Sequence, residues 1–485
     1  LVFEFSNDEG FYDIFKDNKL LTAVAGKQAL ADLDVIRKTL VKKTMLKNYF
    51  GGQNIFLSMH PSPVSGVDIL LTVAAKKDFT LSKFNEVAAK KGELLITPFR
   101  LSGKPGYTVF VKSLNKRFFI IAKGHNIFSG SFSKELVEQS AKYKAKDKQE
   151  FTLLPAQQNS NALANLYINY PQAQVLLSRL FKNETGLFGN LKKLPATAVL
   201  SLNYKSDALM FNGTTTLNNN MPASYINLFV NQQPVQNQLK NIFPSTTAYV
   251  SGFAVSNPAR FTADLALWQQ KTGIDKKRKA LLSQIENETG VDIKTEFNTS
   301  LKNEFAVVTT RFDEKLAIIT IKNGSALTPV LMNISESVSE NRGRFKYDRL
   351  PSYLLGEAFS IFRKPYFMII DNYLILANSS KEIDSYYESY IDHKFLSKME
   401  QYNNFDDLMS QRSNVCAFVL FKNARLLFKR DLFDDIYTNF ENEASGWNDI
   451  YAASYQLTAT DKSYYTNLCI GLNTDSVKTV PGSAK

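Results

Sequence analysis

The sequence predicts an α+β protein made of two tandem copies of an antiparallel-sheet domain with helices packed on the sheet. Three observations predict this fold class. Short alternating segments such as EFAVVTTRF are typical of half-buried strands. Turns such as Asp371-Asn372 join such segments directly, as in antiparallel hairpins. Helical segments alternate with hairpins, and not with single strands, which favours α+β over a doubly wound parallel fold.

Self-similarity at an offset of about 250 residues predicts that the two copies arose by internal duplication. The first match pairs FEFSNDEGF, from Phe3, with FAVSNPARF, from Phe253. Four more matches follow in the same order along the chain. They pair the segments that start at Ile55 and Glu304 and continue from Asp68 and Lys315, at Arg117 and Tyr366, at Ser160 and Ser413, and at Ala198 and Ala452.

The expected order in each copy is strand, long helical stretch, hairpin, helix, hairpin, helix, strand, helix, hairpin. Spacing of 3.6 residues places four apolar residues on one face of the first long helix. They are Leu33, Ile36, Leu40 and Met45. A helix in the second copy carries five apolar or aromatic residues on a face that we expect to be buried. They are Ile383, Tyr386, Tyr387, Tyr390 and Ile391.

The start of that second helix carries a capping signal. Ser379 and Glu382 form an S-x-x-E capping box. The first copy has Phe132 at the matching position, so we expect a different cap there.

Four segments follow from these matches: a first repeat over 1–220, a connector over 221–246, a second repeat over 247–474 and a flexible tail over 475–485. Three prolines break the connector, which we expect to be a packed helix in short pieces. The strand of the second copy starts earlier, at FPSTTAYV, and the first copy lacks that portion. We therefore expect a native segment before Leu1 that holds a signal or a membrane anchor.

Positive charge is concentrated in the first half. Residues 1–250 hold 30 Lys and Arg against 17 Asp and Glu, whereas residues 251–485 hold 28 against 29. The densest patch is AKYKAKDK, which contains Lys142, Lys144, Lys146 and Lys148. A solvated lysine face and a site for an anionic membrane surface both stay open. Nucleic acid is disfavoured, because lysine outnumbers arginine and no base-stacking motif accompanies the patch.

The sequence lacks the motifs of zinc hydrolases, phosphate-binding loops, dinucleotide-binding folds and nucleophile elbows, so we expect no enzyme activity, metal or cofactor. His60, His125 and His393 are expected in solvated turns or helix ends. The acidic pairs at Asp406 and Asp434 are expected in the first turns of helices. Cys416 and Cys469 are expected as buried thiols, although a disulfide stays open if their strands are neighbours.

Three segments of the second copy carry a resemblance to a known group. They are TTAYVSGFAVSNPARF, KNEFAVVTTR and YFMIIDNYLILANSSKEIDSYY. The chain resembles uncharacterised envelope proteins of Bacteroidota that contain a tandemly repeated domain of unknown function. The resemblance implies an N-terminal anchor or signal followed by an extracytoplasmic α+β region. The matching motifs are structural, so the resemblance transfers no functional residue.

The hypothesis that follows is a non-enzymatic, periplasmic or surface-facing component of an envelope complex, tethered to a membrane. One basic and one neutral copy would offer two binding faces on one frame. A carrier of a lipid or another apolar ligand is the alternative, because the 36 Phe and 22 Tyr could line a cavity. An unrecognised hydrolase is a third hypothesis, which a deep pocket with converging acids would favour.

Overall fold

The computed structural model divides the described chain into two compact units. Unit 1 comprises Leu1–Lys182, Thr197–Gly213 and Leu432–Ile450, and unit 2 comprises Asn183–Ala196, Thr214–Asp431 and Tyr451–Lys485. The structure describes residues 1–7, 27–62, 66–77, 79–80, 82–88, 94–124, 126–144, 162–179, 181–182, 191, 193–205, 207–219, 223–442 and 447–473. Predicted features outside these ranges, among them His125, Lys146 and Lys148, are not placed.

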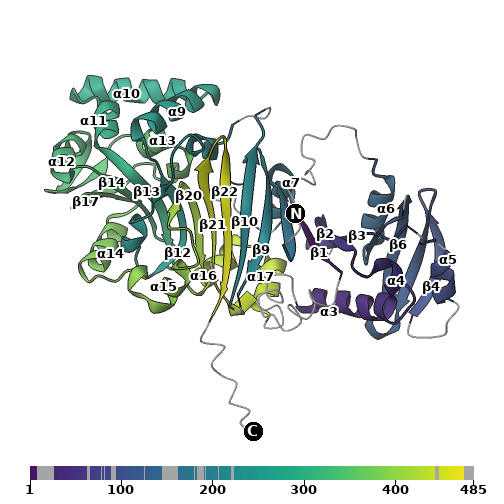
Figure 1. Ribbon diagram of the computed structural model, residues 1–485. Helices are drawn as coiled ribbons and strands as arrows, with labels where there is room; N and C mark the ends of the chain where they lie inside the picture. The colour runs from purple at the N-terminus through teal and green to yellow at the C-terminus, as the bar shows by residue number, and fades with distance from the viewer. Residues whose placement is uncertain are drawn as a thin grey trace, which may run out of the picture. The chain divides into compact units, whose positions relative to one another are not determined.

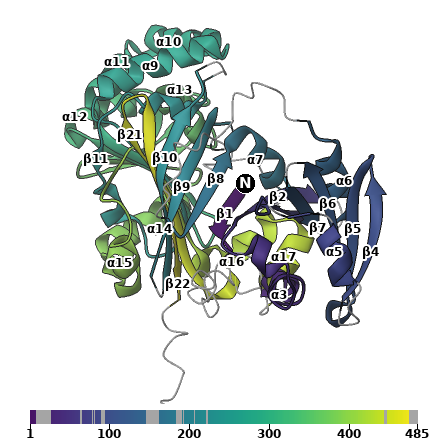
Figure 2. The same ribbon diagram turned by 45° about the vertical axis from the view of Figure 1, so that its right-hand side comes forward.

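Unit 1 is built on antiparallel strands. Its strands are β1 (Val2–Ser6), β2 (Asn54–Ser62), β3 (Gly66–Ala74), β4 (Leu94–Leu101), β5 (Lys104–Val111), β6 (Lys116–Gly124), β7 (Ile127–Ser131), β8 (Ala164–Asn169), β9 (Ala196–Tyr204) and the first part of β10 (Ala208–Leu217). The hydrogen-bonded order is β4-β5-β6-β7-β3-β2-β1-β8-β9-β10. Figure 2 shows β4, β5 and β6 side by side at the outer end of this order.

The helices of unit 1 follow the strands in the predicted places, except α17, which comes from the part of the chain predicted for the second copy. They are α3 (Lys27–Ile36), which continues as a π-helix over Arg37–Lys42, α4 (Lys47–Phe50), α5 (Ser82–Ala88), α6 (Lys134–Lys142), α7 (Tyr170–Leu177) and α17 (Asp434–Glu441). Ser133 caps α6, since its side chain accepts a hydrogen bond from the Leu136 amide. The prediction of a cap that differs from the Ser379 box is therefore confirmed.

Unit 2 contains a second set of antiparallel strands. They are β12 (Thr247–Ala254), β13 (Leu301–Thr310), β14 (Lys315–Ile321), β15 (Ser335–Ser339), β16 (Arg342–Phe345), β17 (Tyr366–Ile370), β18 (Tyr373–Ala377), β20 (Val415–Leu420), β21 (Ile450–Thr460) and β22 (Ser463–Leu472), with a small pair β11 (Val235–Gln236) and β19 (Arg412–Ser413). The main order is β15-β16-β17-β18-β14-β13-β12-β20-β21-β22.

Helices of unit 2 flank these strands. They are α9 (Pro258–Lys271), α10 (Asp275–Thr289), α11 (Ile293–Ser300), α12 (Gly324–Asn333), α13 (Leu350–Leu355), α14 (Ser380–Ile391), α15 (Glu400–Asp406) and α16 (Phe421–Asp431). Figure 1 shows α9, α10 and α11 gathered together, while α14 and α15 lie at another part of the unit. The chain is therefore a mixed α+β protein whose described strand pairs are antiparallel, as predicted.

Aromatic rings fill the core of each unit. In unit 1 the Phe79 ring lies 5.2 Å from the rings of both Phe50 and Phe128, in edge contacts. In unit 2 the Phe305 ring lies 5.7 Å from Phe253 and 5.3 Å from Phe261. Because all six rings are buried, truncation of any one would remove several kcal/mol of stability, by analogy with Phe to Ala changes elsewhere (about 3–5 kcal/mol).

The predicted order of elements missed two strands in each half. Where one hairpin was expected after the second helix, the structure has four antiparallel strands, β4–β7 in unit 1 and β15–β18 in unit 2. The turn at Ser102-Gly103, with φ of 52° and 79°, joins β4 to β5. The two extra strands form the outer end of each sheet order, and the outermost of them, β4 and β15, are edge strands.

Two other expectations on unit 2 need correction. Ile383 and Tyr386 of α14 are buried, but Tyr387 and Ile391 are 38% and 55% exposed. The buried stripe of α14 is thus narrower than predicted, and the Arg342 guanidinium stacks over the Tyr387 ring at 4.9 Å. The connector is packed, but over its described residues, 223–246, it forms 3-10 turns at Tyr225–Phe229 and Leu239–Ile242 and no α-helix. The domain boundaries stay a prediction.

Candidate functional site

The predicted lysine patch can be placed in part. Lys142 ends α6 and its side chain is 64% exposed, and Lys144 follows it in an exposed position. The Lys142 ammonium lies 2.8 Å from the Glu138 carboxylate, so its charge is largely balanced within its own helix. Lys146 and Lys148 lie outside the described residues. Of the two lysines of the patch that the structure describes, Lys144 is exposed and lies at ion-pair distance from no described acid.

A better candidate surface lies on strands β4, β5 and β6 of unit 1. We call it the outer face and define it by five residues, Leu95, Phe99, Phe110, Arg117 and Phe119. Leu95 pairs across the sheet with Phe110, and Phe110 pairs with Arg117. The Phe99 and Phe119 rings meet in an edge contact at 6.3 Å. The outer face is a mainly apolar strip with Arg117 at one end, in which the paired Thr97 and Thr108 lie between Leu95 and Phe99.

Strand alternation explains why these side chains share one side of the sheet. Val109 and Val111 of β5 are fully buried in the aromatic core with α3, α4 and α5. The intervening Phe110 therefore points to the opposite side. There, Phe119 and Leu101 pack on a cluster that includes Leu136 of α6, so α6 covers this end of the strip. Leu95, at the far end of the strip, is 53% exposed.

Positive charge surrounds the outer face. Lys104 lies opposite Leu101 on the covered side of the strip, and Lys123 follows Phe119 on β6 with the same orientation. Burial lowers the pKa of Lys123, and the nearby Lys104 charge lowers it further. Within the ranges that the structure describes, Lys104, Arg117 and Lys123 have no acidic partner at ion-pair distance. The Lys123 ammonium instead lies 5.4 Å from the ring of Tyr143, which is 52% exposed.

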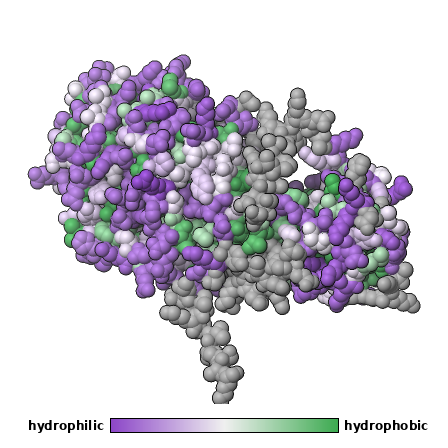
Figure 3. Space-filling model, in the orientation of Figure 1, coloured by the Kyte–Doolittle hydropathy of each residue, from purple (hydrophilic) through white to green (hydrophobic). Residues whose placement is uncertain are grey.

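The matching strands of unit 2 carry a different surface. In the row that corresponds by strand order, Glu336 pairs with Arg344, and Arg344 pairs with Tyr366. The Arg344 guanidinium stacks over the Tyr366 ring at 5.3 Å. A row of leucine, phenylalanine and arginine in unit 1 thus corresponds to a row of glutamate, arginine and tyrosine in unit 2. In the view of Figure 3, hydrophilic residues cover most of the surface of unit 2, with apolar ones scattered among them.

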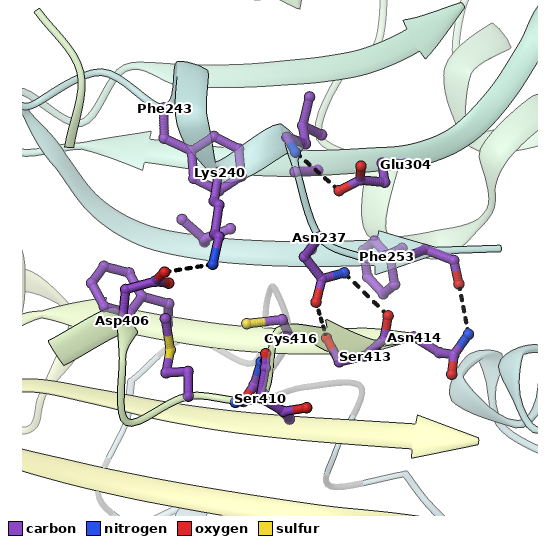
Figure 4. Close-up of a pocket in the computed structure, with 18 of the residues that line it drawn as sticks. Asn237, Lys240, Phe243, Phe253, Glu304, Asp406, Ser410, Ser413, Asn414 and Cys416 are labelled. Carbon is purple, nitrogen blue, oxygen red and sulfur yellow. Dashed lines mark hydrogen bonds and ion pairs between the residues drawn. The ribbon is translucent and has the colours of Figure 1, made fainter. Parts of the chain in front are cut away.

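Unit 2 contains a small cavity between β12, β13, β20 and the connector. Its volume is about 50 Å³, which is room for a few water molecules, whereas pockets for organic ligands reach several hundred Å³. Figure 4 shows an ion pair at one end of this cavity and a group of amide hydrogen bonds at the other. Phe243, Phe253 and Phe418 supply apolar walls. A cavity of this size cannot enclose an acyl chain.

The ion pair joins the connector to the end of α15. The Lys240 ammonium lies 2.5 Å from the Asp406 carboxylate and donates to the Gln411 side chain at 2.9 Å. Both members of the ion pair are nearly buried, with side-chain exposures of 16% and 15%. The second oxygen of Asp406, Oδ1, is buried and accepts no hydrogen bond from the described residues. A water molecule in the cavity would satisfy this oxygen.

Glu304 holds the connector from the other side. Its carboxylate accepts hydrogen bonds from the backbone amides of Gln238 at 2.9 Å and of Leu239 at 3.0 Å, at the start of the 3-10 turn. Burial raises the pKa of Glu304, while the two amides and the Lys240 charge oppose that change. The glutamate therefore acts as a cap for the connector.

Cys416 lines the same cavity as an unreactive thiol. Burial raises its pKa to about 12, although Lys240 opposes the shift. Because the thiolate is the nucleophile, a thiol with this pKa is almost wholly protonated at neutral pH. Cys416 and Cys469 form no disulfide; Cys469 is buried as predicted, whereas Cys416 is half-buried. The charged groups and the thiol of the cavity are thus held in paired or neutral states.

The remaining predicted positions fall in three places. His60 is not in a turn but in β2, where burial lowers its pKa and Ser58 lies 2.9 Å from its Nε2. His393 is exposed at the end of α14, as expected. Asp434 begins α17 and pairs with Lys182 at 2.6 Å, as expected for a first turn. Asp406 ends α15, so its predicted place in a first turn is wrong, and Lys240 balances the charge there.

Sequence reasoning did not find the outer face, the Lys240–Asp406 pair or the Glu304 cap. For the outer face a signal existed, because residues 94–134 contain no Asp or Glu. This stretch holds seven basic residues, Arg100, Lys104, Lys112, Lys116, Arg117, Lys123 and Lys134. The other two features join residues that are far apart in the chain, and no local pattern marks them.

Among the described residues, no set of three His, Cys, Asp or Glu side chains is arranged to hold a metal ion. None of the helices in the described ranges is both long and apolar enough to span a membrane. Comparison of the chain with protein-family models, with curated proteins and with solved structures gave no match.

Proposed function

We propose that the chain is a non-enzymatic interaction component of a bacterial envelope complex, which acts outside the cytoplasm and binds its partner through the outer face of unit 1. The observation that carries the proposal is the contrast between corresponding strands. In unit 1, Leu95 and Arg117 are exposed on either side of the half-buried Phe110, whereas the corresponding row of unit 2 is Glu336, Arg344 and Tyr366. Contiguous exposed apolar surface with a polar rim is typical of binding sites.

Internal duplication is part of this proposal, and the strand orders support it. In the described part of each unit, the main sheet has ten strands in one order when they are numbered from its own first strand, with the first, second and third strands at the centre and the fourth at the outer end. The hairpin-to-helix segment is also shared, since α6 follows β7 and α14 follows β18. Two unrelated sequences would rarely evolve the same ten-strand order with the same crossover connections.

The strand registers agree less closely than the strand order. Phe3 lies opposite Leu166, and Phe253 lies opposite Val415. If Phe3 corresponds to Phe253, Leu166 must correspond to Val415, which is four residues away from the register of the letter match between Ser160 and Ser413. The two halves have therefore diverged in detail on a shared order of strands.

The alternative of a carrier for an apolar ligand has little support in the cavity of unit 2. About 50 Å³ accommodates a few water molecules but not a lipid chain. The aromatic residues that suggested a carrier form tight ring contacts in the cores. An enzyme gains no support from this cavity either, because burial holds the Cys416 thiol in its protonated form and Lys240 is paired with Asp406.

Affinity capture from the envelope of the native cells tests the proposed function. The chain would be captured as wild type and as the double variant Leu95→Ser, Arg117→Gln, and partners would be quantified by mass spectrometry. The matched control is Val338→Ser, Arg344→Gln, which makes the same changes at exposed positions on β15 and β16 of unit 2. We expect one set of envelope components, recovered in stoichiometric amount with the wild type and the control.

The outer-face variant should lose most of that recovery while keeping its circular dichroism spectrum, because all four positions are exposed. Equal recovery with both double variants would contradict the outer face as the interaction surface. Recovery of the wild type without any partner would contradict the assembly function itself.

A further inference from the structure

We infer that the outer face docks on an anionic lipid surface. This inference rests on the proposed function, because it names the partner of the same face. The surface joins two properties that membrane interfaces recognise together, a strip of half-exposed apolar side chains and a surround of unbalanced positive charge. Each property is carried by residues of unit 1 alone.

The charge argument is specific to this part of unit 1. No acidic residue occurs from Leu94 to Lys134, although the stretch spans four strands and the start of α6. The nearest acids on the covering helix are Glu135, which accepts a hydrogen bond from Gln139, and Glu138, which pairs with Lys142. Lys104 and Lys123 lie close enough for one to lower the pKa of the other. A surface of many anionic headgroups would relieve that repulsion.

The apolar side chains fit an interface between water and lipid. Leu95 is 53% exposed on the outermost strand, and Tyr143 is 52% exposed beside Lys123. Tyrosine and lysine both have an apolar body and a polar tip, which suits them to the headgroup layer. Single-stranded nucleic acid would instead need free ring faces for stacking. Phe99 and Phe119 meet at 76° and are half-buried, so these rings do not offer such faces.

The matching surface of unit 2 provides the internal contrast. Arg342 pairs with Asp384, and Glu336 lies directly across from Arg344. Positive charges there have acidic neighbours, and the exposed apolar residue on the outermost strand is Val338. The outer strands of unit 2 therefore lack both properties, and they serve as a control within the same chain.

Vesicle flotation of the full chain tests the inference. The probes are vesicles of phosphatidylcholine alone and vesicles of phosphatidylglycerol and phosphatidylcholine mixed about 1:2. We expect binding to the mixed vesicles at about 0.1 M salt, strong weakening at about 0.5 M salt, and little binding to phosphatidylcholine alone. Equal binding to both kinds of vesicle would overturn the inference.

Two pairs of variants separate the charge from the apolar contribution. The charge variant is Lys104→Gln, Arg117→Gln, Lys123→Gln. Its control removes three exposed lysines from α10 of unit 2: Lys276→Gln, Lys277→Gln, Lys279→Gln. At roughly fivefold per basic residue, the charge variant should bind mixed vesicles about a hundredfold more weakly than the control.

The apolar pair compares Leu95→Ser with Val338→Ser, and we expect about tenfold weaker binding for the first and no change for the second. If neither pair differs, the outer face is not the lipid site. Binding to a single-stranded oligonucleotide without binding to mixed vesicles would likewise overturn the inference. If the vesicles are not bound but an envelope protein is still captured through the outer face, the lipid assignment fails and the proposed interaction function stands.

Discussion

The reactivity of Cys416 gives a sharp test of whether the cavity of unit 2 is chemically active. Burial raises the thiol pKa from 9.0 to about 12. Below both values, the thiolate fraction falls tenfold for each unit, so Cys416 should hold about a thousandfold less thiolate than an ordinary cysteine. Alkylation by iodoacetamide at about pH 8 should slow by about that factor in the folded chain.

The assay measures the alkylated fraction of the Cys416 peptide over time by mass spectrometry. The chain unfolded in urea provides the reference rate. Two variants should shift the folded rate in opposite directions. Asp406→Asn removes a charge that raises the thiol pKa and should speed alkylation, while Lys240→Met removes a charge that lowers it and should slow alkylation. If the alkylation rate of the folded wild type lies within about tenfold of the rate of the unfolded chain, the reasoning is refuted and Cys416 is a reactive thiol.

Three further predictions concern stability. Glu304 has a raised pKa, so its protonated form favours the fold and its contribution to the free energy of unfolding declines as pH rises above about 4.3. The free energy of unfolding of Glu304→Gln, relative to wild type, should therefore rise from about pH 4 to about pH 8. Urea titrations followed by Trp268 fluorescence in a Trp447→Phe background measure it, and a difference that does not change with pH would contradict the prediction. Glu4 is 4% exposed and accepts hydrogen bonds from three side chains, one of them the Tyr167 hydroxyl at 2.5 Å. Glu4→Ala should lower the free energy of unfolding by about 3–6 kcal/mol, and Glu4→Gln should lower it much less. A loss under about 1 kcal/mol for Glu4→Ala would contradict this prediction. Ser379→Ala removes the capping box of α14 and should cost about 0.5–2 kcal/mol in the same titration; an unchanged free energy of unfolding would contradict a stabilising role for the box.

Local patterns carried the predictable part of the fold. Composition and turn signals located β2, β3, β13 and β14, because each is a β-rich segment bounded by turns; β13 and β14 are buried along most of their length. The capping box at Ser379 and Glu382 was also predictable, since both partners lie within one turn. These features depend on neighbours in sequence, so one sequence suffices to find them.

The burial of helix faces was less predictable. Periodicity placed Tyr387 and Ile391 on the same side of α14 as Ile383 and Tyr386. Of these four residues, Ile383 and Tyr386 are buried, whereas Tyr387 and Ile391 are exposed. The width of the buried stripe depends on how far the neighbouring strands extend under the helix. That extent is a tertiary property, and no spacing along α14 encodes it.

The candidate site was hidden for a related reason. Strands β4 and β5 alternate only weakly, because their two sides are a buried core and a half-exposed strip that are both rich in apolar residues. The Lys240–Asp406 pair joins residues 166 positions apart, and Lys240 was one of many lysines in the sequence. The predicted lysine patch contains Tyr143, whose ring lies next to Lys123 at the edge of the outer face. The patch therefore adjoins the candidate site but does not form its centre.

Amide hydrogen exchange would test the central claim most directly. The chain would be compared as purified protein and as captured on membranes from its native cells. Binding through the outer face predicts slower exchange in residues 94–124 on capture, with no change in the matching outer strands of unit 2, residues 335–345. Equal protection of both segments, or protection of residues 335–345 alone, would contradict the assignment of the outer face as the interaction surface.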